Sequence, residues 1–248
     1  MSRKLFCLAV AVVIVGTIFV SAYLASAAPQ GKGNKRILEK RTFIHYKKGH
    51  AKPPWAGGPK DEEKGPKCYG FLGKGVKWKD LPISYVVHPG LKAAAGISTE
   101  TWDNATSAEL FDGYSVDHGA NWDSDKPDGR NELSFGDYAQ DGVIAVTIVW
   151  GYFSGPPGLR KIIEFDILFD TDYEWGYAGP TDEDELGDTS VMDLQNIATH
   201  ELGHGLGLAD IYNCPEVTMY GYSDYGETQK RTLDGPDITG IQELYGAP

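Results

Sequence analysis

The chain has 248 residues, of which 41% are hydrophobic and 12% aromatic, and its formal net charge at pH 7 is −12. This length allows one domain of ordinary size preceded by a leader, with enough apolar residues for a buried core. Residues 68–248 contain 10 Lys/Arg and 31 Asp/Glu, a net charge of −21, which argues against binding to the phosphates of nucleic acids.

The first 27 residues are typical of a secretory signal peptide. Arg3 and Lys4 precede an uncharged apolar run over residues 5–24, and Ala25-Ser26-Ala27 fits a signal cleavage site. We therefore expect residues 1–27 to be removed and the protein to be secreted. The apolar run is longer than the core of most signals, so a membrane anchor through residues 5–24 is the alternative. Contact with a membrane is expected only in that case.

Residues 28–67 differ in kind from the rest of the chain. They hold 11 Lys/Arg against 4 Asp/Glu, include Pro-Pro and Gly-Gly pairs, and show little hydrophobic periodicity. Such a segment cannot bury enough apolar surface to fold alone. A basic segment joined to an acidic domain is typical of a pro-segment or of an arm on the domain surface. A solvated linker is the alternative.

Hydrophobic alternation and turn residues predict the elements of residues 68–248. A strand over residues 83–88 ends at Pro89-Gly90, and a helix is predicted over residues 98–111 with Ser98 as its cap. Two helices, the second over residues 234–246, close the chain, and strands followed by helices give an α+β domain. Between the helix over residues 98–111 and the two closing helices we predict a strand over residues 131–135, a central strand over 143–150 and an edge strand over 162–169.

The first of the two closing helices carries the stretch from Thr199 to Asp210, THELGHGLGLAD. On a helix His200 and His204 share one face, where both imidazoles can reach one Zn²⁺ at roughly 2.0–2.1 Å. Glu201 points beside the metal, where it can take a proton from a zinc-bound water. Gly207 can adopt the positive φ that ends a helix, and Asp210 follows where a third ligand would be delivered.

This pattern resembles the signature of the metzincin metallopeptidases, HExxHxxGxxH followed by a methionine turn. Val217-Thr218-Met219-Tyr220 is similar to the methionine turn of the matrixin branch, and residues 233–246 are similar to the closing matrixin helix. Two residues depart from the matrixin pattern. Asp210 replaces the third histidine, as in the snapalysin peptidases, and Gly221 replaces the proline after Met-Tyr. The resemblance implies a metzincin-like catalytic domain over residues 68–248, with a twisted mixed sheet, three main helices and a zinc cleft.

The function implied is that of a secreted zinc endopeptidase, which hydrolyses peptide bonds by Glu201-assisted attack of zinc-bound water. Met219 would form an apolar floor under the zinc ligands, and Tyr220 would help to form the wall of the substrate pocket. We expect a monomer whose polypeptide substrate adds as a strand along residues 162–169. The alternatives are an inactive or surface-tethered zinc-binding protein and a zinc hydrolase that acts on a non-peptide amide.

Cysteine usage fits an exported protein. Cys7 leaves with the signal, so Cys68 and Cys214 remain, and an even pair in a secreted chain predicts a disulfide. The alternative is that Cys68 is a latency thiol that ligates zinc, as in matrixin zymogens. The residues around Cys68 lack the PRCGxPD context of those zymogens.

Acidic loops indicate calcium as a second, structural cation. Residues 123–129 alternate carboxylates and end in Gly129, while Asp166, Asp170 and Asp172 cluster around a predicted strand. Matrixins commonly bind structural calcium in such loops, so the resemblance implies it here, and a solvated acidic surface is the alternative. We expect the histidines outside the motif to be ordinary surface or packing residues: His45, His50, His88 and His118.

Overall fold

A seven-stranded sheet organises the residues that this computed structural model describes, which are 36–50, 67–179 and 187–248. The strand order is β3-β2-β4-β6-β5-β1-β9. β2, β3, β4 and β6 run parallel, whereas β5 runs antiparallel to both β6 and β1. A second, two-stranded sheet joins β7 and β8. The strands are Glu39–Lys47 (β1), Ile83–Val87 (β2), Phe111–Val116 (β3), Glu132–Gly136 (β4), Val143–Tyr152 (β5), Lys161–Asp170 (β6), Trp175–Gly176 (β7), Met192–Asp193 (β8) and Tyr222–Ser223 (β9).

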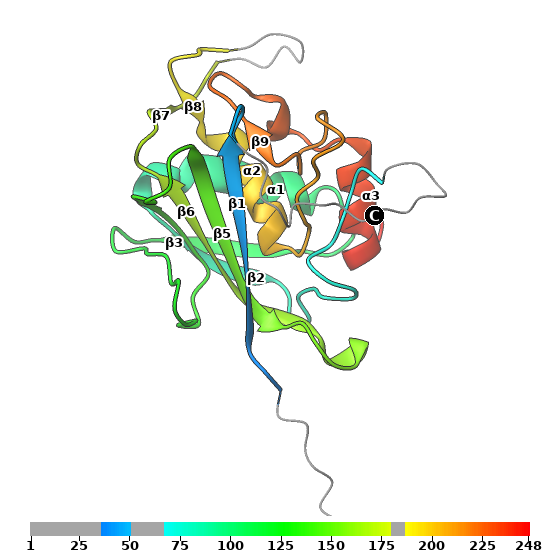
Figure 1. Cartoon of the computed structure of the whole chain (residues 1–248). Helices are drawn as coiled ribbons and strands as arrows, with labels where there is room; N and C mark the ends of the chain where they lie inside the picture. The colour runs from blue at the N-terminus through cyan, green and yellow to red at the C-terminus, as the bar shows by residue number, and fades with distance from the viewer. Residues whose placement is uncertain (1–35, 51–66, 180–186) are drawn as a thin grey trace, which may run out of the picture. The chain divides into compact units, whose positions relative to one another are not determined.

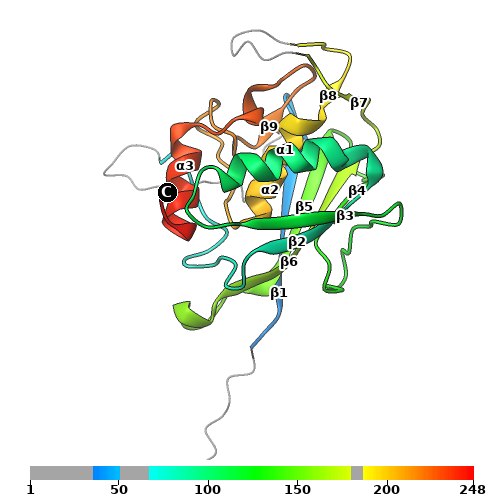
Figure 2. The same ribbon diagram turned by 180° about the vertical axis from the view of Figure 1, so that it is seen from behind.

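The α-helices of the described residues are α1 (Lys92–Asp103), α2 (Leu194–Gly205) and α3 (Gly235–Tyr245). Figure 2 shows α1 and α2 together over one face of the sheet. Trp102 Nε1 on α1 donates to the carbonyl oxygen of Thr199 on α2 at 2.8 Å, and Ser98 Oγ lies 2.8 Å from Thr199 Oγ1. These buried contacts fix α2 against α1. The mixed sheet with three helices confirms the expected fold class.

Helix α1 begins and ends earlier than the sequence indicated. A short 3₁₀ turn over Pro89–Leu91 leads directly into it, so that Ser98 lies inside the helix and does not cap it. The helix stops at Asp103, whose Oδ1 accepts hydrogen bonds from the backbone N–H groups of Leu110 and Phe111. These bonds turn the chain, and Phe111 begins β3 instead of ending a helix.

Strand β5 is central, as predicted, whereas the prediction that residues 162–169 form an edge strand is wrong. Nine of the ten residues of β5 are buried, which is typical of a strand covered on both faces. β6 lies between β4 and β5. The mixed alternation of residues 162–169 suggested an edge strand, but both carboxylates in that range, Glu164 and Asp166, are buried.

Strand β1 comes from the basic segment that was expected to be a pro-segment, a surface arm or a linker. Glu39–Lys47 pairs antiparallel with β5 along its length and parallel with β9 at Tyr46 and Lys47. In Figure 1 this strand, in blue, runs directly beside β5. The segment thus gains its structure by adding to an existing sheet, which agrees with its inability to fold alone. The division of the chain at residue 67 stays a prediction.

The predicted signal peptide and the alternative anchor over residues 5–24 fall outside the described residues. By its internal contacts the chain divides into Met1–Lys35 and Arg36–Pro248, and the second unit holds all the described residues. In the described part of the chain, no helix has the length and apolar character needed to cross a membrane.

A disulfide joins Cys68 to Cys214, with 5.7 Å between the two Cα atoms. It connects the chain ahead of β2 to the loop that precedes Met219. The expected pairing is therefore present in the structure. Because its sulfur is bonded to Cys214, Cys68 does not supply the latency thiol that was the alternative.

Candidate metal centre and active site

Helix α2 positions the motif residues because both of its ends are fixed. At its start the Asp193 side chain accepts a hydrogen bond from the Asn196 N–H at 2.8 Å, which is a normal N-cap. Gly203 allows the helix to approach the methionine turn closely, since a Cβ atom there would collide with the sulfur of Met219. Every residue of the helix from Asn196 to Gly205 is buried.

Gly207 returns the chain toward the two histidines. Its φ is +106°, a conformation that L side chains rarely adopt, and a Cβ atom would lie 3.1 Å from the Val76 carbonyl oxygen. Its N–H donates to the His204 carbonyl oxygen at 2.9 Å, which closes the end of the helix. The turn brings Asp210 to the motif histidines, at the position that the spacing predicted.

His200, His204 and Asp210 form a triangle of ligand atoms. The two Nε2 atoms lie 3.1 Å apart, and Asp210 Oδ1 lies 3.4 Å from each of them. Ligands bound to a tetrahedral Zn²⁺ at 2.0–2.1 Å should lie roughly 3.3 Å from one another. Asp210 Oδ1 is buried and makes no hydrogen bond. The geometry and this unpaired oxygen both fit a zinc ion.

Backbone carbonyls fix the orientation of both imidazoles. His200 Nδ1 lies 2.7 Å from the Thr218 carbonyl oxygen, and His204 Nδ1 lies 3.0 Å from that of Leu208. A carbonyl oxygen can only accept, so each Nδ1 must carry the proton. Both Nε2 atoms then present a lone pair to the metal position, which is the tautomer that a zinc ligand needs.

The charge distribution also fits a cation. Burial lowers the pKa of His200 to about 4, which favours the neutral imidazole. Burial alone would raise the pKa of Asp210, but His204 and His200 outweigh it and hold that pKa below its usual range. The triangle thus offers a carboxylate together with a neutral imidazole.

Glu201 lies beside the triangle and is not part of it. Its Oε1 is 4.0 Å from His200 Nε2, and its Oε2 accepts a hydrogen bond from Thr147 Oγ1 on β5 at 2.5 Å. The side chain is fully buried, and this burial raises the pKa of Glu201 to about 7. A carboxylate with such a pKa can both accept and return a proton near neutral pH.

Met219 packs against Gly203 of α2, where a Cβ atom would collide with its sulfur. It is 1% exposed, and its backbone N–H donates to Asp237 Oδ1 at 3.2 Å. Asp237 Oδ2 accepts from the Thr218 N–H at 2.8 Å, so the start of α3 holds the methionine turn. Tyr220 is partly buried, and its ring centroid lies 5.7 Å from that of Tyr222.

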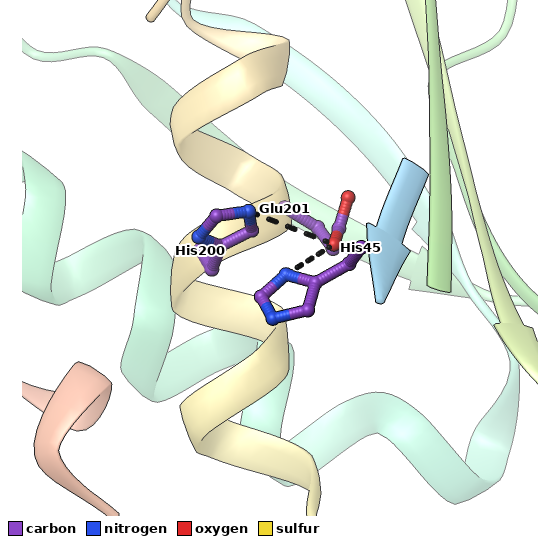
Figure 3. Close-up of side chains that lie close together, drawn as sticks. All are labelled: His45, His200 and Glu201. Carbon is purple, nitrogen blue, oxygen red and sulfur yellow. Dashed lines mark ion pairs between the residues drawn. The ribbon is translucent and has the colours of Figure 1, made fainter. Parts of the chain in front are cut away.

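Two residues of β1 complete the site, and sequence reasoning missed both. His45 Nδ1 lies 3.2 Å from Glu201 Oε1, and the His45 ring meets the His200 ring edge-on with 4.0 Å between centroids. Figure 3 shows the His45 side chain reaching from β1 to Glu201 and His200 on α2. Phe43 stacks on His204, with 4.0 Å between centroids and 6° between planes.

Of the two roles expected for His45, surface or packing, the surface role is therefore wrong. His45 is fully buried against the motif residues. No fixed spacing relates β1 to α2, so the motif itself gave no signal for it. The pair Phe43 and His45, two residues apart on a strand, was the available hint, because such residues face the same side.

A separate acidic cluster lies on strands β4 and β6. Glu132, Glu164 and Asp166 are buried there, and both carboxylate oxygens of Asp166 make no hydrogen bond. Burial raises the pKa of Asp166 to about 9. Asp123 and Asp128 of the predicted calcium loop approach Glu132 closely enough to share an ion with it. Asp170 and Asp172 instead group with Asp137.

The comparisons with known proteins agree with this geometry. Residues 145–246 match the family model of the matrixin peptidases. Human matrix metalloproteinase-16 is 37% identical over 97 residues, which cover 39% of this chain and 14% of that protein. Human matrilysin is 40% identical over 81 residues, covering 33% of this chain and 27% of that protein. The Arabidopsis thaliana metalloendoproteinase 2-MMP is 40% identical over 78 residues, covering 32% and 20% respectively. The chain thus matches less than a third of the length of each of these relatives.

Proposed function

From the matrixin-like character of residues 145–246, we propose that the protein is a secreted zinc-dependent endopeptidase. The observation that carries this proposal is the triangle of His200, His204 and Asp210 with Glu201 beside it. Three protein ligands leave a position open on a tetrahedral zinc, as catalytic zinc sites require.

Zinc, when bound, polarises the scissile carbonyl and lowers the pKa of water. Glu201 takes the proton from the attacking water at Oε1, while Thr147 holds Oε2 in place. The carbon–oxygen bond forms as this proton leaves the water, and Glu201 then passes the proton to the leaving nitrogen as the carbon–nitrogen bond breaks. A carboxylate with a pKa near 7 is suited to both transfers.

The substrate lies along β5 and not along β6. Thr147, in the middle of β5, contacts Glu201 directly, so this strand borders the catalytic base. β6 already pairs with a strand on each side and has no free edge. An extended polypeptide would add to β5 through backbone hydrogen bonds, in the place that β1 holds in the structure. Tyr220 would contribute to the wall of the pocket, and Met219 to the floor beneath the ligands.

Calcium is the second cation that we propose. Asp123, Asp128 and Glu132 lie close enough to share this ion, and Asp166 with Glu164 beside them would complete the ligands, because carboxylate oxygens suit Ca²⁺. The unpaired, buried carboxylate of Asp166 supports this assignment. We further propose that the protein is a monomer and that residues 28–67 act as a pro-segment.

Zinc analysis and casein hydrolysis test the proposed function. The full chain and its Phe43→Ala/His45→Ala variant should each contain about one zinc per chain. Casein hydrolysis, measured in the more active of the two, should stop with a chelator and return when zinc is added. Hydrolysis that is unaffected by removal of the metal would contradict the proposal, and so would a zinc content near zero in both proteins.

A further inference from the structure

We propose that β1 is a built-in occupant of the substrate position and that His45 holds it there by closing the catalytic base. This inference rests on the proposed peptidase function, because it assigns β1 to the place where a substrate would bind. The residue that keeps the site inactive is then a histidine and not a zinc-binding thiol.

The backbone of β1 uses the groups that a substrate strand would need. It pairs with β5 from Glu39 to Tyr46, which takes up the edge of β5 that faces away from β6. On its other side, the Lys48 N–H donates to the Ser223 carbonyl oxygen at 2.9 Å. A second polypeptide cannot add to β5 until β1 leaves, since one strand edge accepts one partner.

The side chains of β1 cover the metal centre from that position. Phe43 and His45 share a face because side chains alternate along a strand. Phe43 lies flat on His204, and His45 lies against His200 and Glu201. The ligand triangle is therefore bracketed by two residues of one strand.

A chain of hydrogen bonds orients His45 toward the base. Lys230 Nζ donates to Ser223 Oγ at 2.7 Å, so the Ser223 hydroxyl can direct its own proton to His45 Nε2, which lies 3.0 Å away. A neutral His45 that accepts at Nε2 carries its proton on Nδ1. His45 Nδ1 lies 3.2 Å from Glu201 Oε1, and neither of these two buried atoms makes a hydrogen bond to any other group. The attacking water would need this place.

Charge complementarity supports β1 as the occupant. The segment over residues 28–67 is basic, with 11 Lys/Arg against 4 Asp/Glu, and residues 68–248 are strongly acidic. Next to the site, Lys48 pairs with Glu227, and Lys47 lies 3.8 Å from Asp224. The matched family region begins at residue 145, so β1 lies outside it.

A labelled peptide with the sequence of Glu39–Lys47, EKRTFIHYK, tests the proposal on the full chain. Its binding is followed by fluorescence anisotropy, with and without a zinc chelator. The parent chain should bind it weakly because its own β1 fills the site. The Phe43→Ala/His45→Ala chain should bind it at least tenfold more tightly, and a peptide with alanine in place of histidine should bind that chain more weakly.

Thr42→Ala is the matched control, because Thr42 is an exposed residue of the same strand. This variant should bind the peptide no better than the parent. His45→Gln provides a second variant of similar size, and thermal unfolding establishes that each variant is folded. Casein hydrolysis by the full chain should rise with His45→Gln and should not change with Thr42→Ala.

Equal peptide binding by the parent and by both folded His45 variants would overturn the proposal. Binding does not require hydrolysis, so this result is separate from a failure of the peptidase function. If the His45 variants bind the peptide but hydrolyse no casein, the occupant is correct and the proposed activity is wrong.

Discussion

His45 Nδ1 lies 3.2 Å from Glu201 Oε1, with both side chains fully buried, although one residue belongs to β1 and the other to α2. This contact joins the basic N-terminal segment to the residue that we assign as the general base. The base is therefore enclosed by the chain's own strand, while Thr147 holds its second oxygen.

Glu201→Gln should remove activity and keep the metal. Glutamine has the same shape, and Glu201 does not ligate the metal position, so zinc content and thermal unfolding should resemble those of the parent. Loss of the base should lower casein hydrolysis by about 10²–10⁴-fold. The comparison is made in the His45→Gln background, so that an open site is present in both proteins. Activity within about tenfold of that background would remove Glu201 from the role of base.

Asp210→Ala should lose zinc, because the carboxylate supplies the third corner of the ligand triangle. Mutating a residue that only supports a zinc ligand costs up to about 100-fold in metal affinity. Removal of a direct ligand should lower the zinc affinity by more than that. Asp210→His should retain more zinc than Asp210→Ala, since imidazole is also a good zinc ligand. Zinc affinity is measured by competition with a chelator of known strength. An unchanged affinity in Asp210→Ala would mean that another residue supplies the third ligand.

The motif residues could be predicted from the sequence because their geometry is local. A spacing of four on a helix places His200 and His204 on one face, and Gly207 with Asp210 follows at fixed offsets. The residues that support them come from other elements: Thr147 from β5, Asp237 from α3 and His45 from β1. No periodicity links such distant positions, so they became visible only in the structure.

The strand order was harder to predict for a related reason. The carboxylates of β6 resembled a solvent-facing side, and that pattern normally marks an edge strand. Glu164 is buried because it accepts hydrogen bonds from the N–H groups of Asp128 and Gly129 in the loop before β4, and Asp166 lies beside it. Asp170 instead groups with Asp137 and Asp172. The basic segment was likewise interpreted from its charge, which gives no information about which sheet edge it joins.

Asp166→Asn should abolish stabilisation by calcium. The buried Asp166 carboxylate makes no hydrogen bond. Glu164 lies on the same strand, β6, and Glu132 lies opposite Asp166 on the neighbouring strand, β4. In the parent, calcium at 100 times its dissociation constant should stabilise the fold by about 2.7 kcal/mol. The variant should show little of this shift in thermal unfolding, yet be at least as stable as the parent without calcium. Asp80→Asn, at an exposed carboxylate, serves as the control. A full calcium shift in the Asp166 variant would place the ion elsewhere.

The Cys68–Cys214 disulfide should stabilise the fold, since it closes a loop with a sequence separation of 146. Replacing both cysteines by alanine should lower the free energy of unfolding by roughly 2–5 kcal/mol. Zinc content should not change, because neither sulfur belongs to the ligand triangle. The measurement is urea unfolding of the oxidised parent and the double variant. Thiol titration of the unfolded, unreduced parent supplies the control, and two free thiols would contradict the bridge.

Lys230 should make stability depend on pH above neutrality. The side chain is fully buried, and its Nζ donates to the Tyr222 carbonyl oxygen and to Ser223 Oγ, both at 2.7 Å. Burial lowers the pKa of Lys230 from its ordinary value of 10.5 to about 8. Between these two values the folded chain has released a proton that the unfolded chain still holds. The free energy of unfolding should therefore rise with pH in this window, and the gain should be absent below pH 8.

Lys230→Met isolates this contribution, because methionine fills similar space and does not titrate. The stability of the parent relative to the variant should increase between pH 8 and 10.5, by on the order of 1 kcal/mol per pH unit. Urea unfolding of both proteins at a series of pH values from 7 to 10.5, at the same saturating zinc concentration, measures this difference. Groups common to both proteins cancel in it. If the two stability curves ran parallel across the window, Lys230 would keep its proton in the fold, and its bond to Ser223 would be that of a permanent cation.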